Sequence, residues 1–178
     1  FFSYPVDCLF VAAMNPCPCG YFPDRNRCHC TPGQIRAYQR GISKPILERM
    51  DLCVSLPPIT LQDALTKEKG ISSAVLRKQV EKARKMQERR FFQEEKIRWN
   101  GDMNVRAVNK YCELGKEEAE YMENIFKLKN LSMRTYHKIL KLARTIADLE
   151  EEEKINMNHL AEAVSYRGLE EVLFSFEG

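Results

Sequence analysis

Two Cys-x-Cys pairs that directly follow a short apolar run constrain the fold of this chain more than any other part of its sequence. The run (CLFVAAM, residues 8–14) is continuous and ends at Asn15-Pro16, where the first pair begins. An apolar run of this length is typical of a strand that is buried on both faces of a mostly parallel sheet. Pro16 has no N–H to donate to a sheet ladder, so we expect the strand to end there.

The four thiols after this run are placed to hold a metal ion. They form two short-range pairs, Cys17 with Cys19 and Cys28 with Cys30. Two such pairs can grip one tetrahedral Zn²⁺ from two sides, because zinc prefers four nitrogen or sulfur ligands. Four protein ligands leave no position open for water. The sequence therefore predicts a structural zinc site at these cysteines, and not a catalytic one.

Free thiols in a turn-rich loop and long-range disulfides are the alternatives to zinc. The spacing differs from the common Cys-x2-Cys knuckle, and His29 can replace one sulfur ligand, although its neighbours are better placed. The chain has seven cysteines, an odd number, and no visible secretory signal. Both observations indicate a reducing compartment and argue against a disulfide framework, so zinc is the favoured interpretation.

The rest of the chain has the pattern of one more short strand followed by helices. The second strand is predicted at residues 52–57 (LCVSLP), and a long charged helix at residues 72–98. Shorter helices are expected at residues 105–113 and 116–129, then at 133–149 after a Ser132 cap, and finally after an Asn156 cap. The predicted fold class is mainly α with a small α/β part. We expect an α/β part with the cysteine loop at residues 1–60, a long basic connecting helix at 61–100 and a helical bundle at 101–178.

Charge is unevenly distributed along the chain, although the net charge is only +3. Basic residues gather in residues 77–98, among them Arg84, Lys85, Arg89 and Arg90. A charge run of this kind favours a solvated helix face, and contact with nucleic acid phosphates is the alternative. No apolar run approaches the roughly 18 residues of a membrane span, and no signal peptide is visible. We therefore expect a cytoplasmic protein without a membrane partner.

Three polar residues lie where an α/β protein can bind phosphate. Asn15 follows the first predicted strand, at the carboxyl edge of the sheet, where ligands bind. Arg49 lies between a short helix and the second predicted strand. Arg134 lies in the first turn of a helix, where the helix dipole favours an anion.

Each of these residues also has an ordinary explanation. Asn15 can cap a turn before the proline, and Arg49 can pair with nearby Glu48 or Asp51 at the surface. Arg134 can be an exposed helix residue, although a cation in the first turn is unfavourable unless an anion is near. Arg144 is a rival for the phosphate role, but it lies about three turns further along the same helix and points elsewhere.

Four stretches of this sequence together resemble the magnesium-chelatase-like AAA+ ATPases of the ComM/YifB family. They are VAAMNPCPCGY, ISKPILERMDL, LSMRTYHKILKLARTIADL and HLAEAVSYR, and the resemblance covers nearly the whole chain except residues 168–178. It implies that this chain is the C-terminal portion of an AAA+ α/β core, followed by a long helix and a helical lid. In that family, Asn15 looks like the sensor-1 residue, Arg49 like the arginine finger and Arg134 like the sensor-2 arginine.

The resemblance also implies a function. It points to a homo-oligomeric ring, expected to be a hexamer, that uses ATP with Mg²⁺ to remodel DNA, as in branch migration during competence. No G-x-x-x-x-G-K-[ST] phosphate loop and no apolar run ending in paired acidic residues occur in this sequence. We therefore expect the chain on its own neither to bind ATP tightly nor to hydrolyse it. The alternatives are the ATPase subunit of a magnesium chelatase and a non-enzymatic, zinc-containing interaction module.

Overall fold

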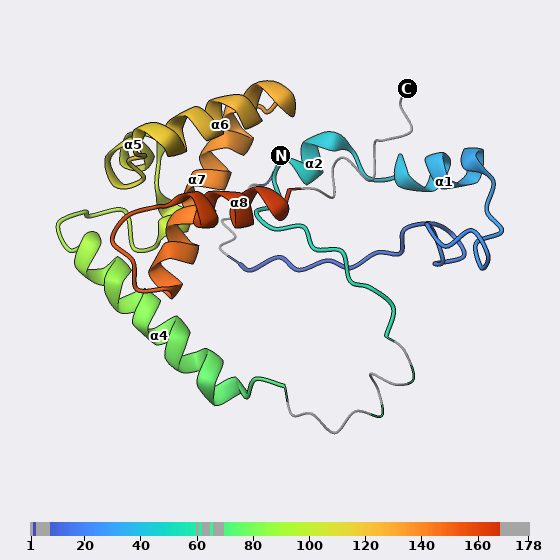
Figure 1. The fold of residues 1–178 in the computed structure, drawn as a ribbon, viewed down its shortest axis with the longest axis horizontal. Helices are drawn as coiled ribbons and strands as arrows, with labels where there is room; N and C mark the ends of the chain where they lie inside the picture. The colour runs from blue at the N-terminus through green and yellow to red at the C-terminus, as the bar shows by residue number, and fades with distance from the viewer. Residues whose placement is uncertain (1, 3–7, 60, 62–64, 66–69, 168–178) are drawn as a thin grey trace. The chain divides into compact units, whose positions relative to one another are not determined.

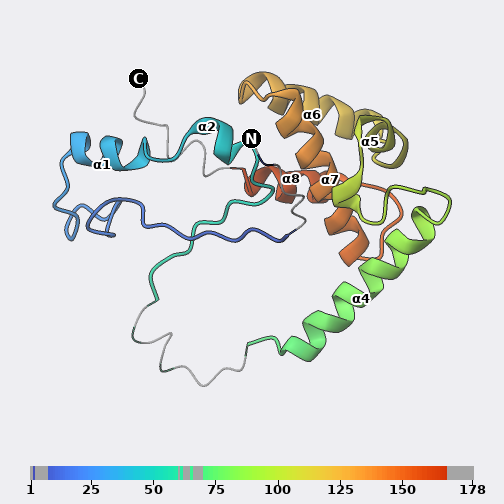
Figure 2. The same ribbon diagram turned by 180° about the vertical axis from the view of Figure 1, so that it is seen from behind.

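The computed structural model describes residues 2, 8–59, 61, 65 and 70–167. These residues divide into two compact units, the first up to Lys44 and the second from Pro45 onward. Figures 1 and 2 show the helices of both units from opposite sides. The three-part division at residues 1–60, 61–100 and 101–178 stays a prediction.

The first unit contains the cysteine loop and the helix that follows it, α1 (Pro32–Gln39). A capping box starts this helix: Thr31 Oγ1 accepts from the Gln34 N–H at 3.2 Å, and Gln34 Oε1 accepts from the Thr31 N–H at 2.9 Å. Proline in the first helical turn has no N–H that needs a partner. At the other end of α1, Gln39 Nε2 donates to the Pro16 carbonyl at 3.1 Å, which joins the helix to the start of the cysteine loop.

The second unit is a helical bundle with α7 (Met133–Leu149) in contact with most of its other helices. α7 packs against α8 (Met157–Ser165), α4 (Ser73–Arg90), α5 (Val105–Tyr111) and the short 3-10 helix η1 (Asn100–Asp102). α6 (Lys116–Leu128) packs against α8, and a single-turn helix, α2 (Lys44–Leu47), precedes the bundle in the sequence. The core lies between α5, α6, α7 and α8 and includes Val108, Met122, Ile139 and Leu160.

Short polar side chains set where these helices begin. Ser72, Asn104, Ser132 and Asn156 each accept a hydrogen bond from a main-chain N–H in the first turn of α4, α5, α7 and α8. Such a cap satisfies one of the N–H groups that have no partner inside the helix. The helix starts predicted after Ser132 and Asn156 are thus confirmed.

The long helix predicted over residues 72–98 is shorter in the structure, because α4 ends at Arg90. Phe91 turns inward there and is only 4% exposed. Its ring meets the Tyr111 ring edge-on, with centroids 5.2 Å apart. Burying an aromatic ring in this way outweighs the small gain of extending a polar helix by two turns.

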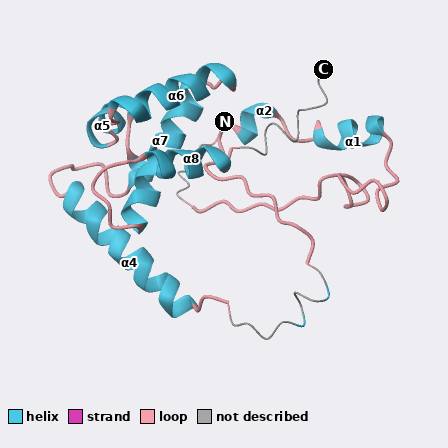
Figure 3. Cartoon of the chain, in the orientation of Figure 1, coloured by secondary structure: helices cyan, strands magenta, loops and turns pink. Residues whose placement is uncertain are grey.

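The predicted strands at residues 8–14 and 52–57 do not form in the structure. Both segments are extended, and the described residues contain helices and loops but no strand (Figure 3). A strand exists only when a neighbour completes its hydrogen-bond ladder. Leu9 and Val11 are 91% and 80% exposed, and the Cys53 N–H donates to the Tyr166 carbonyl at the end of α8. The mainly helical fold class is confirmed, and its α/β part is not.

None of the described helices is long and apolar enough to cross a membrane.

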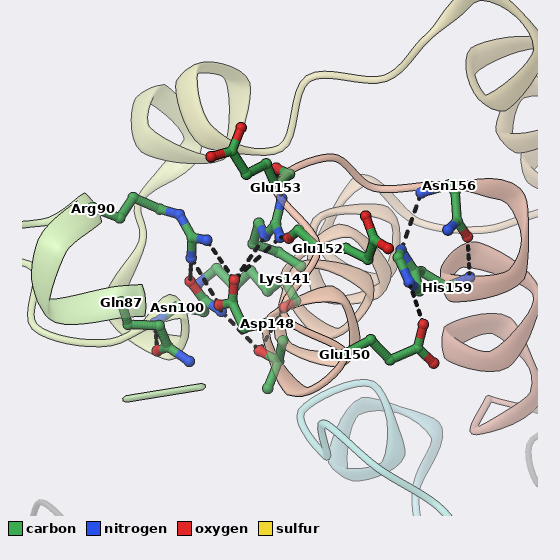
Figure 4. A network of polar contacts seen from close by, with 12 residues as sticks. Gln87, Arg90, Asn100, Lys141, Asp148, Glu150, Glu152, Glu153, Asn156 and His159 are labelled. Carbon is green, nitrogen blue, oxygen red and sulfur yellow. Dashed lines mark hydrogen bonds and ion pairs between the residues drawn. The ribbon is translucent and has the colours of Figure 1, made fainter. Parts of the chain in front are cut away.

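A buried polar network fixes α4 against the last turns of α7 (Figure 4). At its centre the fully buried carboxylate of Asp148 forms an ion pair with Arg90 from α4 and another, at 3.1 Å, with Arg144 from α7. Asn100 in η1 donates its side-chain amide to the same carboxylate at 2.8 Å, and its N–H to Gln87 Oε1 at 2.9 Å. One carboxylate of α7 therefore holds α4 and η1, which lie 58 and 48 positions before it in the sequence.

The C-terminal end of α7 depends on the same network. Arg144 also donates to the main-chain carbonyls of Glu152 and Glu153 in the loop before α8. On the far side of this loop, His159 accepts the Asn156 N–H on Nδ1 at 3.1 Å, and its Nε2 lies 2.9 Å from Glu150 Oε2. Since Nδ1 accepts, the Nε2 proton of the neutral ring points at the Glu150 carboxylate. The α7–α8 connection is thereby held from both ends (Figure 4).

Candidate functional site

The cysteine loop, residues 17–30, contains the four cysteines that are candidate metal ligands. The buried apolar cluster of the first unit consists of Cys17 and Cys28 from this loop and Ile35 from α1. Among the described residues of this unit the cluster is small, and small hydrophobic clusters contribute little stability. A metal ion bound by the thiols would add to it.

The four sulfurs are close enough to hold one ion. The Sγ atoms of Cys17, Cys19, Cys28 and Cys30 all lie within 4.8 Å of one another. Cys17 Sγ is 3.3 Å from Cys19 Sγ and 3.8 Å from Cys28 Sγ, and Cys19 Sγ is 3.6 Å from Cys28 Sγ. Four sulfurs at about 2.3 Å from a tetrahedral zinc ion lie about 3.8 Å apart. The spacing therefore fits a four-thiolate site, and all four cysteines are free thiols, not disulfides.

Main-chain hydrogen bonds, burial and the neighbouring sulfurs shift the pKa values of these thiols in different directions. The Tyr21 N–H lowers the pKa of Cys19 to about 6, so this thiol is mostly ionised at neutral pH. Burial raises the pKa of Cys28. The Cys19 N–H lowers the pKa of Cys30, but the hydrogen bond to the Cys19 sulfur opposes it, and the pKa of Cys30 rises to about 12. Burial opposes the shift at Cys17, but hydrogen bonds, chiefly with the Phe22 main chain, lower the pKa of this thiol. Without a metal, the Cys19 thiolate thus lies beside Cys28 and Cys30, whose pKa values are raised, and a divalent cation would displace the protons of these two thiols.

Tight turns bring the first pair together beside Asn15. The Gly20 N–H donates to the Cys17 carbonyl at 3.0 Å, and Gly20 has a φ of +83°. This backbone conformation favours glycine, because a side chain there is strained. A Cβ on Gly20 would lie 3.7 Å from Asn15 Cγ, so the exposed Asn15 side chain reaches over the first turn of the cysteine loop.

Arg49 lies in a segment that the helical bundle holds at three points. Lys138 of α7 donates to the Arg49 carbonyl at 2.5 Å and to Asp51 Oδ1 at 2.6 Å. At the end of α8, Arg167 Nη1 donates to the Met50 carbonyl at 2.7 Å. The Arg49 side chain is exposed and donates to the Pro45 carbonyl at 2.8 Å. Its backbone is therefore fixed while its guanidinium faces solvent.

Arg134 lies one turn before Lys138 on the same helix. It is the second residue of α7, it is exposed, and the first turn contains no acidic residue. Residues four apart on a helix share a face, so Arg134 and Lys138 project from the same side of α7. The structure thus brings Arg49 and Arg134 into one unit, connected through Lys138. Asn15 belongs to the other unit.

Arg144, the alternative to Arg134 as the residue that contacts phosphate, has a different role in the structure. Its side chain is 2% exposed and committed to Asp148 and to two loop carbonyls. Burial lowers the pKa of Arg144, and the Asp148 carboxylate opposes this shift. A guanidinium with these partners cannot reach a phosphate at the surface.

The contacts of Lys138 with Arg49 and Asp51, and the role of Asp148, were not predicted from the sequence. The i,i+4 spacing of Arg144 and Asp148 is a local signal that indicates a helix ion pair. The contact of Lys138 with Asp51 has no such signal, because 87 positions separate them.

Comparisons with known proteins match the two parts of the chain to the two parts of one family. The family described as "Magnesium chelatase, subunit ChlI" matches residues 1–64, and "Magnesium chelatase, subunit ChlI C-terminal" matches residues 70–167. The helical bundle falls in the second match and the cysteine loop in the first. The chain belongs to the magnesium chelatase ChlI family.

Individual relatives are similar over almost the full length of the chain. "Uncharacterized protein YifB" of Salmonella typhimurium is 38% identical over 98% of this chain and 34% of its own length. "Competence protein ComM" of Haemophilus influenzae is 36% identical over 96% of this chain and 33% of its own length. YifB of Escherichia coli is 36% identical over 98% of this chain and 34% of its own length. The chain therefore spans about a third of the curated relatives that it matches, and the resemblance to the ComM/YifB family is confirmed.

Proposed function

We propose that this chain is the lid-containing part of a ring-forming AAA+ ATPase that remodels DNA in the cytoplasm, with Mg²⁺ and ATP bound between subunits. One observation carries the proposal. The bundle holds the Arg49 backbone beside α7, and the first turn of α7 contains Arg134 and no acidic residue. A cation at a helix N-terminus is unfavourable unless an anion binds there, and a nucleotide phosphate supplies that anion.

The proposed role of each side chain comes from the family resemblance. Arg134 would contact the γ-phosphate of ATP in its own subunit, and Arg49 would reach the ATP of the neighbouring subunit in the ring. Asn15 would orient the attacking water. Positive groups placed where charge develops stabilise the transition state of phosphoryl transfer. Because Lys138 contacts the Arg49 backbone and shares a helix face with Arg134, movement of the lid would shift both arginines together.

DNA is the proposed partner because of the relatives. One of them is named a competence protein, and a second candidate, the ATPase subunit of a magnesium chelatase, shares the same family. The identity of 36–38% to ComM and YifB over nearly the whole chain favours the first.

The experiment compares ATP hydrolysis with and without DNA, in a protein of the relatives' length that contains this chain. We expect DNA to increase the hydrolysis rate several-fold at low salt and to lose this effect as salt rises, because phosphate contacts are screened. A DNA-independent ATPase would support the chelatase alternative. A protein that hydrolyses no ATP would support the non-enzymatic interaction module.

We further propose that the four cysteines hold one structural Zn²⁺. Metal analysis should find about one zinc per chain, and Cys28→Ser should lose it, because three thiolates and a hydroxyl bind zinc far more weakly. A chelator should remove hydrogen-exchange protection from α1, since metal binding contributes apparent stabilities of roughly 10–16 kcal/mol in small zinc domains. The fluorescence of Trp99, the only tryptophan, should stay unchanged because it reports on the other unit.

Cys8→Ser is the matched control, because Cys8 is an exposed thiol outside the cluster. It should keep the zinc of the unchanged protein. A protein that contains no metal and yet protects its α1 amides from exchange would contradict the zinc proposal.

A further inference from the structure

Basic residues on α4 are sorted onto one face of the helix. Lys78, Lys82, Lys85 and Arg89 are spaced by four, three and four positions, so they form a single column along the helix, which we call the basic stripe. Each is exposed, and neighbouring cations lie about one helical turn, or about 5.4 Å, apart. The adjacent column alternates in sign, with Arg77, Glu81, Arg84 and Glu88, and has no net charge. The basic stripe is therefore a local feature and not a consequence of overall composition.

The structure also shows which basic residues of this helix are available to a partner. Arg90 is used inside the unit, because it pairs with the buried Asp148. Arg84 lies over the Trp99 ring, with its guanidinium carbon 5.3 Å from the ring centroid. Lys82 of the stripe pairs with Glu151, but both side chains are more than half exposed, so this pair exchanges readily for another anion.

An exposed aromatic ring lies at the C-terminal end of the basic stripe. Phe92 is 88% exposed, although its neighbour Phe91 is 4% exposed. Phe92 lines a shallow surface hollow of about 400 Å³ together with Lys85, Arg89 and Glu88. Two cations beside an uncovered ring, with a single opposing carboxylate, make a hollow that suits a flat, partly apolar group attached to an anion.

We infer that the basic stripe and Phe92 form a binding surface for a single strand of nucleic acid. Phosphates would lie along the four cations, and one base would stack on the Phe92 ring. Proteins that hold single strands combine such a charged track with aromatic side chains on which bases stack. In a duplex the bases already stack on each other, so no base face would be available to stack on the Phe92 ring. This inference rests on the proposed function, since it names the form of DNA that the ATPase would hold.

The test measures the binding of this chain to fluorescent oligonucleotides by anisotropy at several salt concentrations. The probes are an oligothymidylate, an oligouridylate of the same length and a hairpin duplex. The chain should bind at least one of the two single strands more tightly than the duplex. A preference for the duplex overturns the inference.

Two sets of substitutions separate charge from stacking. Neutralising the stripe with Lys78→Gln, Lys85→Gln and Arg89→Gln should weaken binding and reduce the slope of log K against log salt by about 2, since each phosphate contact on a single strand contributes about 0.7. Phe92→Ala should weaken binding roughly 5- to 150-fold and leave that slope unchanged, because stacking releases no counterions. Phe92→Tyr should restore the affinity.

The matched control removes the same charge elsewhere on the bundle, with Lys116→Gln, Lys127→Gln and Lys154→Gln, three exposed lysines outside α4. It should leave the slope of log K against log salt unchanged. If both triple variants lose the same affinity for the oligonucleotide, the basic stripe is not the binding surface and the inference is wrong. Circular dichroism and Trp99 fluorescence confirm that each variant is folded. If Phe92→Ala changes self-association in sedimentation but not oligonucleotide binding, Phe92 is a contact between protein copies and the inference is wrong.

Failure of this inference can be told apart from failure of the proposed function. If DNA leaves ATP hydrolysis unchanged while the stripe variant loses binding to single strands, the proposed function is wrong and the inferred binding surface is supported. If DNA stimulates ATP hydrolysis but the stripe variant binds single strands as well as its control variant does, the inferred binding surface is wrong and the proposed function is supported.

Discussion

Arg49→Ala is expected to lower ATP hydrolysis by roughly three to five orders of magnitude, the range that an arginine finger contributes. The measurement uses a protein of the relatives' length that contains this chain, with ATP binding measured separately. Binding should change little, because the arginine finger acts on charge that develops during phosphoryl transfer. The fold should be unaffected, since the exposed side chain makes one hydrogen bond, to the Pro45 carbonyl. Arg106→Ala, an exposed arginine on α5, is the matched control and should keep full turnover.

Mixing two inactive variants tests whether Arg49 acts on the neighbouring subunit. Arg134→Ala should also be inactive, because it removes the phosphate contact within its own subunit. In a ring that mixes both variants, a subunit with intact Arg134 can receive the intact Arg49 of its neighbour. Equal, random mixing should restore activity at about a quarter of the interfaces. If both arginines served the same subunit's ATP, no mixture would recover activity, and the proposed role of Arg49 would be wrong.

The second large effect is expected at the centre of the buried network. Asp148→Asn keeps the size of the side chain but leaves Arg90 and Arg144 facing each other without a carboxylate between them. Removing one partner from a buried ion pair typically costs about 3–5 kcal/mol, because the remaining charges stay desolvated. Since domains of this size have only about 5–15 kcal/mol of stability, we expect the second unit to be close to unfolding at physiological temperature. Urea denaturation followed by Trp99 fluorescence measures the change.

Glu123→Gln is the matched control for this prediction. It also converts a helical carboxylate in an ion pair to an amide, but Glu123 and Lys127 lie four residues apart on α6 with side chains 64% and 69% exposed. Exposed pairs of this kind contribute about 0.3–0.5 kcal/mol. Similar losses of stability in both variants would show that burial of Asp148 is not what makes the network important.

The helices and the cysteine cluster could be predicted because their signals are local. Ser132 and Asn156 cap helices through hydrogen bonds to residues three positions away. The four thiols come together within a loop of 14 residues, Cys17 to Cys30, so spacing alone indicated that they meet. The strands at residues 8–14 and 52–57 could not be predicted in the same way. A strand depends on a neighbouring strand, and no described residue pairs with either segment in a sheet.

The sequence by itself determined where the helices of the bundle begin and which thiols form the four-cysteine cluster, because caps and short-range thiol pairs act over a few residues. Only the tertiary structure decided which basic residues stay available to a partner. Lys85, Arg89 and Arg90 look alike in the sequence, but packing of α4 on α7 pairs Arg90 with the buried Asp148 and leaves the other two exposed. It also placed Lys138 against Arg49 and Asp51. Burial and pairing of charges depend on residues far away in the chain, and no local pattern contains that information.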